Sequence, residues 1–406
     1  MTTSVHINEL AEAVSAHPLT ALRDIAGARA LVTDEHYKHS LGIVRQLGRQ
    51  GVAVSVVASS KESLACRSRY CREVILAESG QPESLVKTIL QTLRQRHFDL
   101  VIPVSYSMTL ALARQKDQLL PYTRLEVPPY QTIAQASDKW EMTRLAQRVA
   151  VPAPRTIRAS ELDQLGPELR FPLVLKPQQE TPGRPPIRYL YKKEELSAVR
   201  LQLSNSRHNG ASSEFIVQEY VPGHGCGLFA TYQNGVCKRV FMHRRLREYP
   251  ASGGVSSCAE SFYDLKLESH GRRMLDALNW HGVAMVEFRR DDRDGEYKLM
   301  EINPKFWGSL DLALAAGADF PSDLCQMALG GTLSFTDQYV RDLRFHWPLS
   351  SQGDLYHLWT RPQSFFAVAI DALNPRVKSN VWLGDFRPNL SELGSLVARA
   401  FRSGKA

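Results

Sequence analysis

The sequence predicts a three-layer α/β domain with a parallel sheet, followed by an α+β region. Two observations carry this prediction. Residues 28–104 alternate between short apolar, β-branched segments and segments of helical periodicity, as successive β-α-β units do. Residues 136–330 instead place several strands one after another, joined by polar turns. A chain of 406 residues is long enough for two or three domains.

The N-terminal α/β domain is expected over residues 28–135, after a helical lead-in at 1–27. Apolar runs predict its strands, and 3.6-residue periodicity predicts its helices. The strands are expected at 28–33, 52–58 and 100–104, and the helices at 39–50 and 83–96. No GxGxxG motif follows the first strand and no GxxxxGK[ST] motif occurs in the chain, so any nucleotide must be held in another way.

The α+β region is expected over residues 136–330, with a division into two subdomains near residue 220. It begins with a helix at 138–149, and a hairpin is expected around Asn234-Gly235. The other elements are strands at 171–176, 187–191, 215–220, 229–232, 236–242, 283–288 and 297–302, and helices at 265–278, 310–316 and 321–329. Residues 331–406 form a C-terminal extension that ends in a helix at 391–402.

Composition indicates a globular protein of the cytoplasm. Hydrophobic residues make up 43% and charged residues 23% of the chain, and no apolar run approaches the roughly 20 residues that span a bilayer. No signal peptide is apparent, and the six cysteines form no CxxC pair, so reduced thiols are expected. The net charge of +8 is spread along the chain, which favours an enzyme that binds polyphosphate over a nucleic-acid partner.

A pair of carboxylates near the middle of the chain is the strongest functional signal. Glu287 lies in GVAMVEFRRD, and Glu301 lies in KLMEINPKFWGS, with a polar turn between the two segments. A hairpin would put both glutamates on neighbouring strands, with Asn303 on the same face. Three oxygen ligands at a strand end suit a hard cation such as Mg²⁺. Such cations usually accompany nucleotide phosphates, so phosphoryl chemistry is expected.

Two lysines are candidates for contacts with phosphate. Lys139 opens the helix at 138–149, and Lys176 ends the apolar strand FPLVLK. A lysine that ends a buried strand is unusual, which makes Lys176 the stronger candidate. Lysine ammonium groups lower the cost of bringing polyphosphate to a reacting centre.

Two further segments carry candidate binding residues. One strand ends at Gln218, Glu219, Tyr220 and Val221, and its backbone could face an adenine edge. An ordinary core strand would have the same sequence pattern. The segment 243–256 joins an arginine cluster to Gly253 and Gly254, which is typical of a site for an acidic substrate or an acyl phosphate. A solvated basic loop is the alternative for this segment.

Taken in order, SDKWEMTRLA, PLVLKP, IVQEYVPG, RRLREYPASGGVSS and MEINPKFWGS resemble the ATP-grasp superfamily over roughly residues 28–330. Within it the chain is most similar to the carboxylate–amine ligase and predicted carboligase branch, which includes D-aspartate ligases. The resemblance implies the ATP-grasp fold, with ATP between two α+β subdomains and a preceding parallel α/β domain. The loop after Lys176 departs from the family pattern, because it contains only one glycine, Gly183.

The resemblance also implies roles for individual residues. Lys139 and Lys176 would contact the ATP phosphates, the backbone at 218–221 would hold adenine, and His224 would replace the carboxylate that usually binds ribose. The metal ligands would be Glu287, Glu301 and Asn303, for two Mg²⁺ ions that Mn²⁺ can replace. Residues acting on the acyl phosphate would be Arg247, Gly253, Gly254 and Lys305.

The reaction implied is activation of a carboxylate as an acyl phosphate, with ADP and phosphate as products, followed by coupling to an amine. An amino acid or a similar molecule is the expected substrate. The partners would be small molecules, with no nucleic acid or membrane, and a homodimer is allowed. Two alternatives stay open: an ATP-grasp carboxylase or kinase, and a non-catalytic ATP-binding module.

Overall fold

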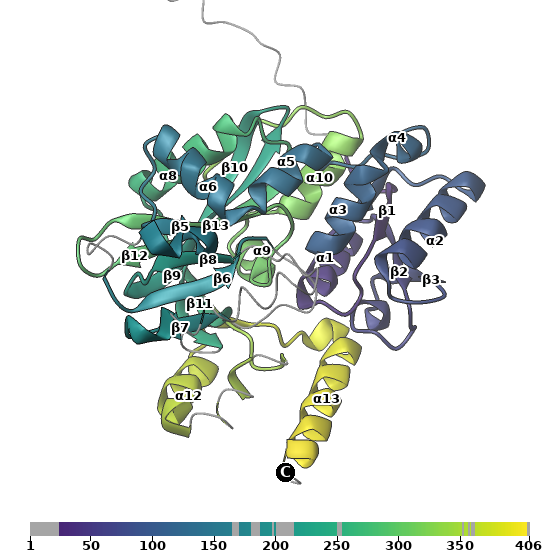
Figure 1. The fold of residues 1–406 in the computed structure, drawn as a ribbon. Coiled ribbons are helices and arrows are strands. Elements are labelled where there is room, and N and C mark those ends of the chain that lie inside the picture. The colour runs from purple at the N-terminus through teal and green to yellow at the C-terminus, as the bar shows by residue number, and fades with distance from the viewer. Residues whose placement is uncertain are drawn as a thin grey trace, which may run out of the picture.

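The computed structural model describes residues 24–164, 170–179, 187–196, 199, 215–249, 254–350, 353–355, 358 and 362–403. The strands in these ranges form three sheets (Figure 1). Almost all of the lead-in expected at 1–27 lies outside the described residues, and so do Gly183 and Gly253. Within the described residues, no helix is both long enough and apolar enough to cross a bilayer.

The N-terminal sheet is parallel, with strand order β3-β2-β1-β4, as the alternating pattern predicts. Leu31 faces the α2 and α3 side, whereas Ala30 and Val32 face α1, so helices cover both faces and form three layers. The elements are β1 (Arg29–Val32), α1 (Lys38–Arg49), β2 (Ala53–Ala58), β3 (Cys71–Leu76), α2 (Pro82–Gln95), β4 (Leu100–Ile102), α3 (Tyr106–Arg114) and α4 (Lys116–Leu119).

The edge strand β3 has no counterpart among the strands that the sequence predicts. Its residues are only partly buried, because β3 pairs with one neighbour, β2, at the edge of the sheet. Its sequence CREVIL therefore mixes charged and apolar side chains, and it lacks the continuous apolar run that marks a central parallel strand.

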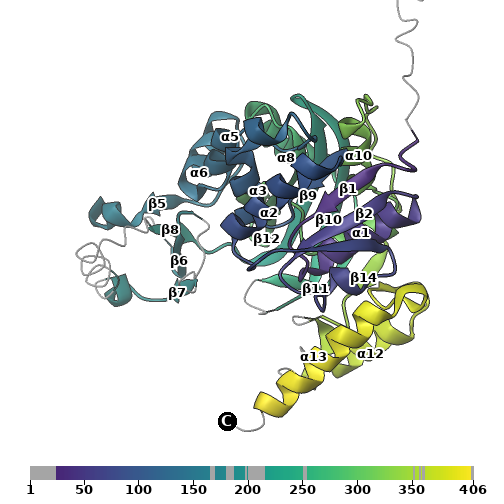
Figure 2. The same cartoon turned by 90° about the vertical axis from the view of Figure 1, so that its right-hand side faces the viewer.

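The second sheet is small and antiparallel, with strand order β5-β8-β6-β7. In Figure 2 it stands to one side of the molecule, away from the N-terminal sheet. Two helices, α5 (Tyr130–Ala136) and α6 (Lys139–Arg148), precede it. Its strands are β5 (Thr156–Arg158), β6 (Leu173–Pro177), β7 (Arg188–Leu190) and β8 (Phe215–Glu219).

The third sheet has seven strands in the order β13-β12-β9-β10-β11-β14-β15, all antiparallel except the β14–β15 pair. Helices α8 (Leu265–Ala277), α9 (Leu310–Ala315) and α10 (Phe320–Ala328) belong to the same part of the chain. The strands are β9 (Gly223–Gln233), β10 (Val236–Tyr249), β11 (Val255–Ser261), β12 (Gly282–Asp291), β13 (Tyr297–Asn303), β14 (Arg344–His346) and β15 (Lys378–Ser379).

The β9–β10 hairpin turns at Asn234-Gly235, as expected, and both residues have positive φ (51° and 79°). Such a turn matches the twist of the strands. Both strands are longer than the sequence predicts, because β9 begins at Gly223 and β10 continues to Tyr249. The strands expected at 229–232 and 236–242 are therefore too short, and the alternative of a solvated basic loop for 243–256 is wrong for the part that lies in β10. β9 is bonded to β10 on one side and β12 on the other, and this pairing overrides the low strand propensity of its glycines.

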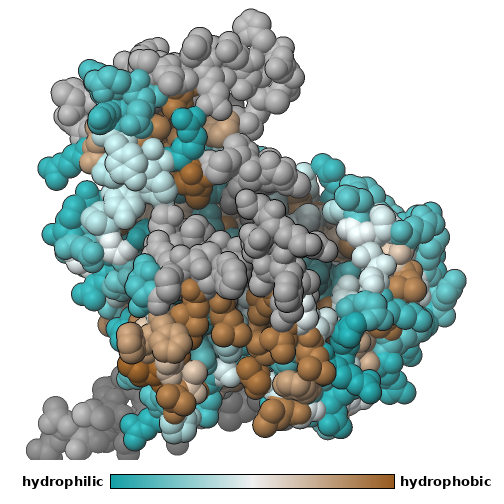
Figure 3. Space-filling view, turned by 90° about the horizontal axis from the view of Figure 1, so that it is seen from below, coloured by the Kyte–Doolittle hydropathy of each residue, from teal (hydrophilic) through white to brown (hydrophobic). Residues whose placement is uncertain are grey.

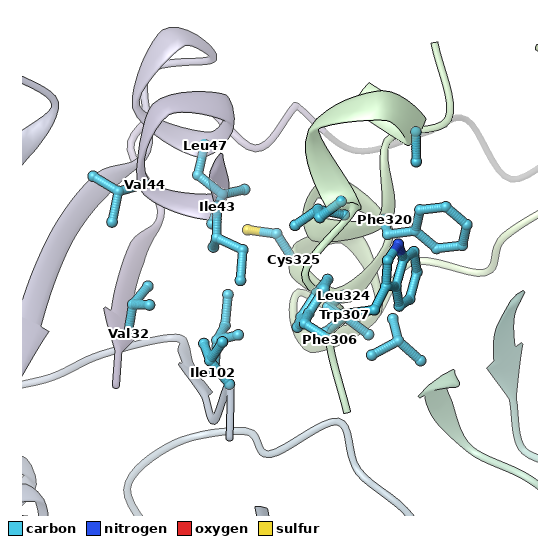
Figure 4. Packing of buried hydrophobic residues seen from close by; sticks show 14 of the residues in the cluster. Val32, Ile43, Val44, Leu47, Ile102, Phe306, Trp307, Phe320, Leu324 and Cys325 are labelled. Carbon is cyan, nitrogen blue, oxygen red and sulfur yellow. The ribbon is translucent and has the colours of Figure 1, made fainter. Parts of the chain in front are cut away.

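Helix α1 joins the N-terminal sheet to the rest of the molecule. Its Ile43 and Leu47 extend toward Leu324 and Cys325 of α10, in a buried cluster that also includes Trp307 (Figure 4). Because this cluster is continuous from β1 to the segment after β13, the N-terminus of α1 is held next to residues 305–309.

The C-terminal segment adds β14 and β15 to the large sheet and contributes α12 (Phe365–Leu373) and α13 (Arg387–Ser403). The spacing of Trp347, Tyr356, Trp359, Phe365 and Phe366 predicts packing residues rather than ligand contacts. Trp347 is fully buried, as this predicts, but Phe366 is 77% exposed, so the prediction is wrong for α12. Seen from below, the face that carries these helices shows hydrophobic surface beside hydrophilic surface (Figure 3). Tyr356 and Trp359 lie outside the described residues.

Candidate nucleotide site

A cleft of about 390 Å³ lies between the small sheet, the β12–β13 hairpin and the segment after β13. Its size is that of a small-molecule site. Nearly all of the residues that the sequence singles out line it. These are Lys139, Lys176, Gln218, Glu219, Tyr220, Val221, Gly254, Glu287, Glu301, Asn303 and Lys305.

The β12–β13 hairpin brings the two glutamates together. Glu287 is directly opposite Glu301, and Asn303 is opposite Met285, two residues along the same face. A register shift follows this pair, so that Phe288 is opposite Leu299 and Met300 is the extra residue. Asn303 donates from Nδ2 to Glu301 Oε1 at 3.0 Å. The hairpin and the shared face that the sequence predicts are confirmed.

Two cations face these carboxylates. Arg245 Nη2 lies 2.8 Å from Glu287 Oε2, and Lys139 Nζ lies 3.5 Å from Glu301 Oε2. Burial raises the pKa of Glu287, Arg245 lowers it in part, and the negative charge of Glu301 raises it again. The pair is therefore a concentrated negative site that a nearby positive charge stabilises.

The donor set fits a magnesium ion. Carboxylate and amide oxygens are hard ligands, and a cation between Glu287 and Glu301 would offset the repulsion that raises the pKa of Glu287. In the part of the chain that the structure describes, no three His, Cys, Asp or Glu side chains gather as a metal site. Two carboxylates and one amide are sufficient only if other oxygens complete the shell, as phosphates do for Mg²⁺.

Helix α6 and strand β6 bring the two lysines to the same cleft. Asp138 caps α6 by accepting hydrogen bonds from the N–H groups of Trp140 and Glu141, both at 3.0 Å. Its second oxygen accepts from Gln178 Nε2 at 2.7 Å, and Lys139 N donates to Gln178 O at 2.9 Å. These bonds tie the start of α6 to the end of β6, so Lys139 and Lys176 line one wall although they are far apart in sequence.

The end of β8 forms another wall of the cleft. The N–H groups of Glu219 and Tyr220 already donate to Arg155 O (2.9 Å) and Pro172 O (3.2 Å). These two N–H groups are therefore occupied, so a backbone N–H that binds a ligand edge is expected at Val221 rather than at Glu219 or Tyr220. Apolar side chains lie around it, among them Val174, Ile187, Met285 and Met300. An aromatic base could be held between this wall and the backbone.

The structure places two predicted site residues elsewhere. Arg247 binds Asp354 (Nη2–Oδ2, 2.7 Å) and Asp371, both in the C-terminal segment. His224 lines a second cavity of about 330 Å³, together with Arg244 and Arg290. The reason is strand geometry: alternate residues point to opposite faces, and His224 is opposite Arg290 whereas Glu287 faces the cleft.

Several cleft residues are missing from the sequence prediction. Arg245, singled out only as one member of the 243–256 cluster, is the arginine that faces Glu287, and Arg289 and Met285 also line the cleft. His243, which is buried, shares a hydrogen bond with Ser309 (Nε2–Oγ, 2.6 Å), and burial lowers its pKa to about 3. The available signal for Arg245 was the arginine cluster itself, which does not indicate which of its arginines faces Glu287.

Solved structures of similar fold decide the architecture. A biotin carboxylase–βγ-ATP complex from Campylobacter jejuni matches with a TM-score of 0.64 and 16% identity, over 78% of this chain and 74% of that one. An L-amino acid ligase from Bacillus licheniformis matches with a TM-score of 0.57 and 16% identity, over 76% and 75%. The chain has the ATP-grasp fold. This confirms the fold that the motifs imply.

Sequence comparisons narrow the likeness within the ATP-grasp superfamily. Residues 211–347 match the family model described as "ATP-grasp in the biosynthetic pathway with Ter operon". D-aspartate ligase from Enterococcus faecium (strain Aus0004) is 25% identical over 243 residues, which are 54% of this chain and 57% of that protein. The predicted similarity to D-aspartate ligases and their branch is confirmed. The alignment spans little more than half of the relative's length.

Proposed function

We propose that the chain is an ATP-dependent ligase that activates a carboxylate and joins it to an amine. One observation carries the proposal: the Glu287–Glu301 pair, Asn303, two lysines and the end of β8 line a single cleft. The similarity to D-aspartate ligase supports this outcome over other ATP-grasp reactions. The partners are small molecules, and the site of action is the cytoplasm. A homodimer is compatible with the proposal.

ATP would bind with its adenine against Val221 and its phosphates toward Lys139 and Lys176. Mg²⁺, as one or two ions held by Glu287, Glu301 and Asn303 and replaceable by Mn²⁺, would neutralise phosphate charge. The two lysines and Arg245 add positive charge on the same side of the cleft. Because these side chains are largely buried, their interactions with phosphate oxygens are stronger than in water.

The reaction has two steps. A carboxylate oxygen of the substrate attacks the γ-phosphorus of ATP, and the bond to the bridging oxygen breaks with release of ADP. The amine then attacks the acyl carbon of the acyl phosphate, phosphate leaves, and the nitrogen loses a proton. Gly254 and Lys305 line the cleft and are the candidates to stabilise charge on the acyl phosphate, and Arg245 takes the place assigned to Arg247 from the sequence.

The decisive experiment measures products. The full chain, incubated with ATP, Mg²⁺ and paired amino acids and small acids, should release ADP and phosphate only when a suitable acid is present. Hydroxylamine in place of the amine should trap a hydroxamate. Release of AMP and pyrophosphate would refute the acyl-phosphate chemistry, and incorporation of labelled bicarbonate or a stable phosphorylated product would favour the carboxylase or kinase alternative.

A variant tests the metal assignment. Glu301→Gln should lower acid-dependent phosphate release by about a hundredfold or more, since loss of a group that stabilises charge in the reacting state typically costs this much. Glu78→Gln is the matched control, because Glu78 is exposed and lies outside the cleft. Equal turnover in Glu301→Gln and wild type would refute the assignment of Glu301 to a catalytic metal site.

A further inference from the structure

A second polar cluster lies where the N-terminal sheet meets the cleft. Lys38 begins α1, just past the carboxyl end of β1, the edge at which open parallel sheets bind ligands. A Cβ built on Gly308, which lines the cleft, would be 3.5 Å from Lys38 Cε. The end of the Lys38 side chain therefore lies close to Gly308 at the edge of the cleft.

The ammonium group of Lys38 has no matching acceptor among the described residues. Its Nζ lies over the Trp347 ring, 4.4 Å from the centroid, and no described carboxylate lies within 4 Å of it. Asp311 is the acid whose charge acts most strongly on Lys38, but its carboxylate accepts a hydrogen bond from Trp347 Nε1 at 3.0 Å. Burial lowers the pKa of Lys38 to about 8, although Asp311, Glu392 and Asp354 partly offset this.

The N-terminus of α1 is also uncapped by a side chain. Its N-cap residue is Tyr37, which makes no side-chain cap hydrogen bond, and the first turn contains no acidic residue. It contains Lys38 and His39 instead. The first N–H groups of a helix have no partner within the helix, and the helix dipole favours an anion there, so basic residues in this turn are unfavourable unless an anion joins them.

His39 gives an independent indication. Its side chain is 9% exposed, and Nδ1 is buried without a hydrogen-bond partner. Burial lowers the pKa of His39, and the positive charges of Lys305 and Lys38 lower it further. A buried polar atom without a partner is costly, and its usual explanation is a group that is absent from the coordinates, such as a ligand. His39 is thus close enough to Lys38 and to Lys305, which lines the cleft, for their charges to act on it.

We propose that Lys38 and His39, at the N-terminus of α1, bind a second carboxylate of the acid whose first carboxylate is activated in the cleft. This rests on the proposed function. The substrate is then a dicarboxylic acid, which includes an amino acid activated at its side chain and held by its α-carboxylate. The ammonium of Lys38, the ring N–H of His39 and the first N–H groups of α1 supply the charge-assisted hydrogen bonds that such a group requires.

The test is a binding measurement with matched acids. Calorimetric titration of the full chain, with Mg²⁺ and a non-hydrolysable ATP analogue present, would compare aspartate with its α-amide isoasparagine, glutamate with its α-amide isoglutamine, and succinate with succinamate. Wild type should bind at least one diacid about tenfold or more tightly than its monoamide. Lys38→Met should abolish that preference and leave affinity for the ATP analogue unchanged, and His39→Gln should weaken it.

The control is Lys87→Met, which removes an exposed lysine from α2 and should keep the preference. The proposal fails if wild type prefers no diacid in the panel, or if Lys38→Met folds and keeps the preference. O-phosphoserine serves as the phosphate arm, and tighter binding of it than of every diacid would overturn the carboxylate assignment. A retained diacid preference without hydroxamate formation would refute the proposed chemistry while supporting this subsite.

Discussion

Four charged side chains in the cleft form two largely buried pairs, and the partners of each pair lie on different elements. Glu287 of β12 pairs with Arg245 of β10, and Glu301 of β13 lies near Lys139 of α6. The desolvation cost of a buried charge is offset when an opposite charge lies next to it. A ligand that enters between the two partners changes their interaction energy. Binding of a cation and polyphosphate would therefore exchange these partners without leaving a buried charge alone.

Lys38 differs because no carboxylate among the described residues lies within 4 Å of its ammonium group, which leads to a prediction about stability. Lys38→Met keeps the length of the side chain and its contact with Trp347 and removes a buried charge. Below pH 8 it should raise the free energy of unfolding by about 1–2 kcal/mol. This is less than the lowered pKa implies, because Asp311 and Glu392, whose pKa values are already raised, lose a nearby cation.

The pH window of this effect follows from the pKa of Lys38, which is about 8 in the folded chain and has an ordinary value of 10.5 when the chain is unfolded. Between these values the unfolded chain binds the extra proton, so wild-type stability rises with pH. The advantage of Lys38→Met should therefore shrink from pH 8 and vanish near pH 10.5. Urea denaturation at several pH values measures this, and a constant difference would show that Lys38 is not desolvated.

The contrast between Arg245 and Arg247 shows how far single residues can be predicted. The sequence indicates an arginine cluster beside a glycine pair, and the cluster does contain the residue that faces Glu287. It does not indicate which arginine, because the register of β10 against β11 shifts between Arg245 and Arg247 and again at Glu248. Bulges depend on packing between strands, so the face of a residue beyond one cannot be read from spacing.

At the scale of elements, the start of α6 links helix capping to the site. Asp138→Ala removes the cap and the bond to Gln178, so it should lower the free energy of unfolding by about 1–2 kcal/mol. Because the same bonds hold Lys139 beside β6, affinity for ATP should fall about tenfold, which fluorescence titration with an ATP analogue would measure.

Asp264→Ala is the matched control for that variant. Asp264 caps α8 in the same way, by accepting from the N–H groups of Lys266 and Leu267, and it does not line the cleft. It should cost similar stability without a change in ATP affinity. Equal loss of affinity in both variants would mean that the position of Lys139 does not depend on its helix cap.

Helices and strands whose own sequence carries caps, breakers or alternation were predictable. Strands that are extended only because they pair with adjacent strands were not. Helix α6 has an N-cap aspartate and ends before two prolines, and the β12–β13 hairpin has alternating strands around a polar turn, so both were found nearly in full. β9 was predicted too short, because Gly223–Gly227 carries no strand signal. Those residues are extended only because β10 and β12 lie on either side of them.

Over the whole molecule, the C-terminal segment is joined to the large sheet by a charged network. Asp354 and Asp371 are 0% and 2% exposed, and Arg247 binds both, while Arg344 of β14 also binds Asp371 at 3.0 Å. The network connects β10, whose Arg245 faces the cleft, to residues more than 100 positions further along the chain. Arg247 thus has a structural setting that accounts for its burial.

The last prediction separates this structural role from the catalytic role expected from the sequence. Arg247→Met leaves Asp354 and Asp371 without a main partner in a buried setting, so the free energy of unfolding should fall by about 3–5 kcal/mol. Asp371→Asn should also destabilise, and the double variant should cost less than the sum, because both changes break one network. Arg244→Met, which removes the neighbouring, more exposed arginine, should cost under about 1 kcal/mol.

Urea denaturation measures these energies, and calorimetry measures the affinity of each variant for an ATP analogue and of Arg247→Met for the acid. If Arg247→Met keeps wild-type stability but loses acid-dependent phosphate release, Arg247 acts on the substrate and the network is incidental.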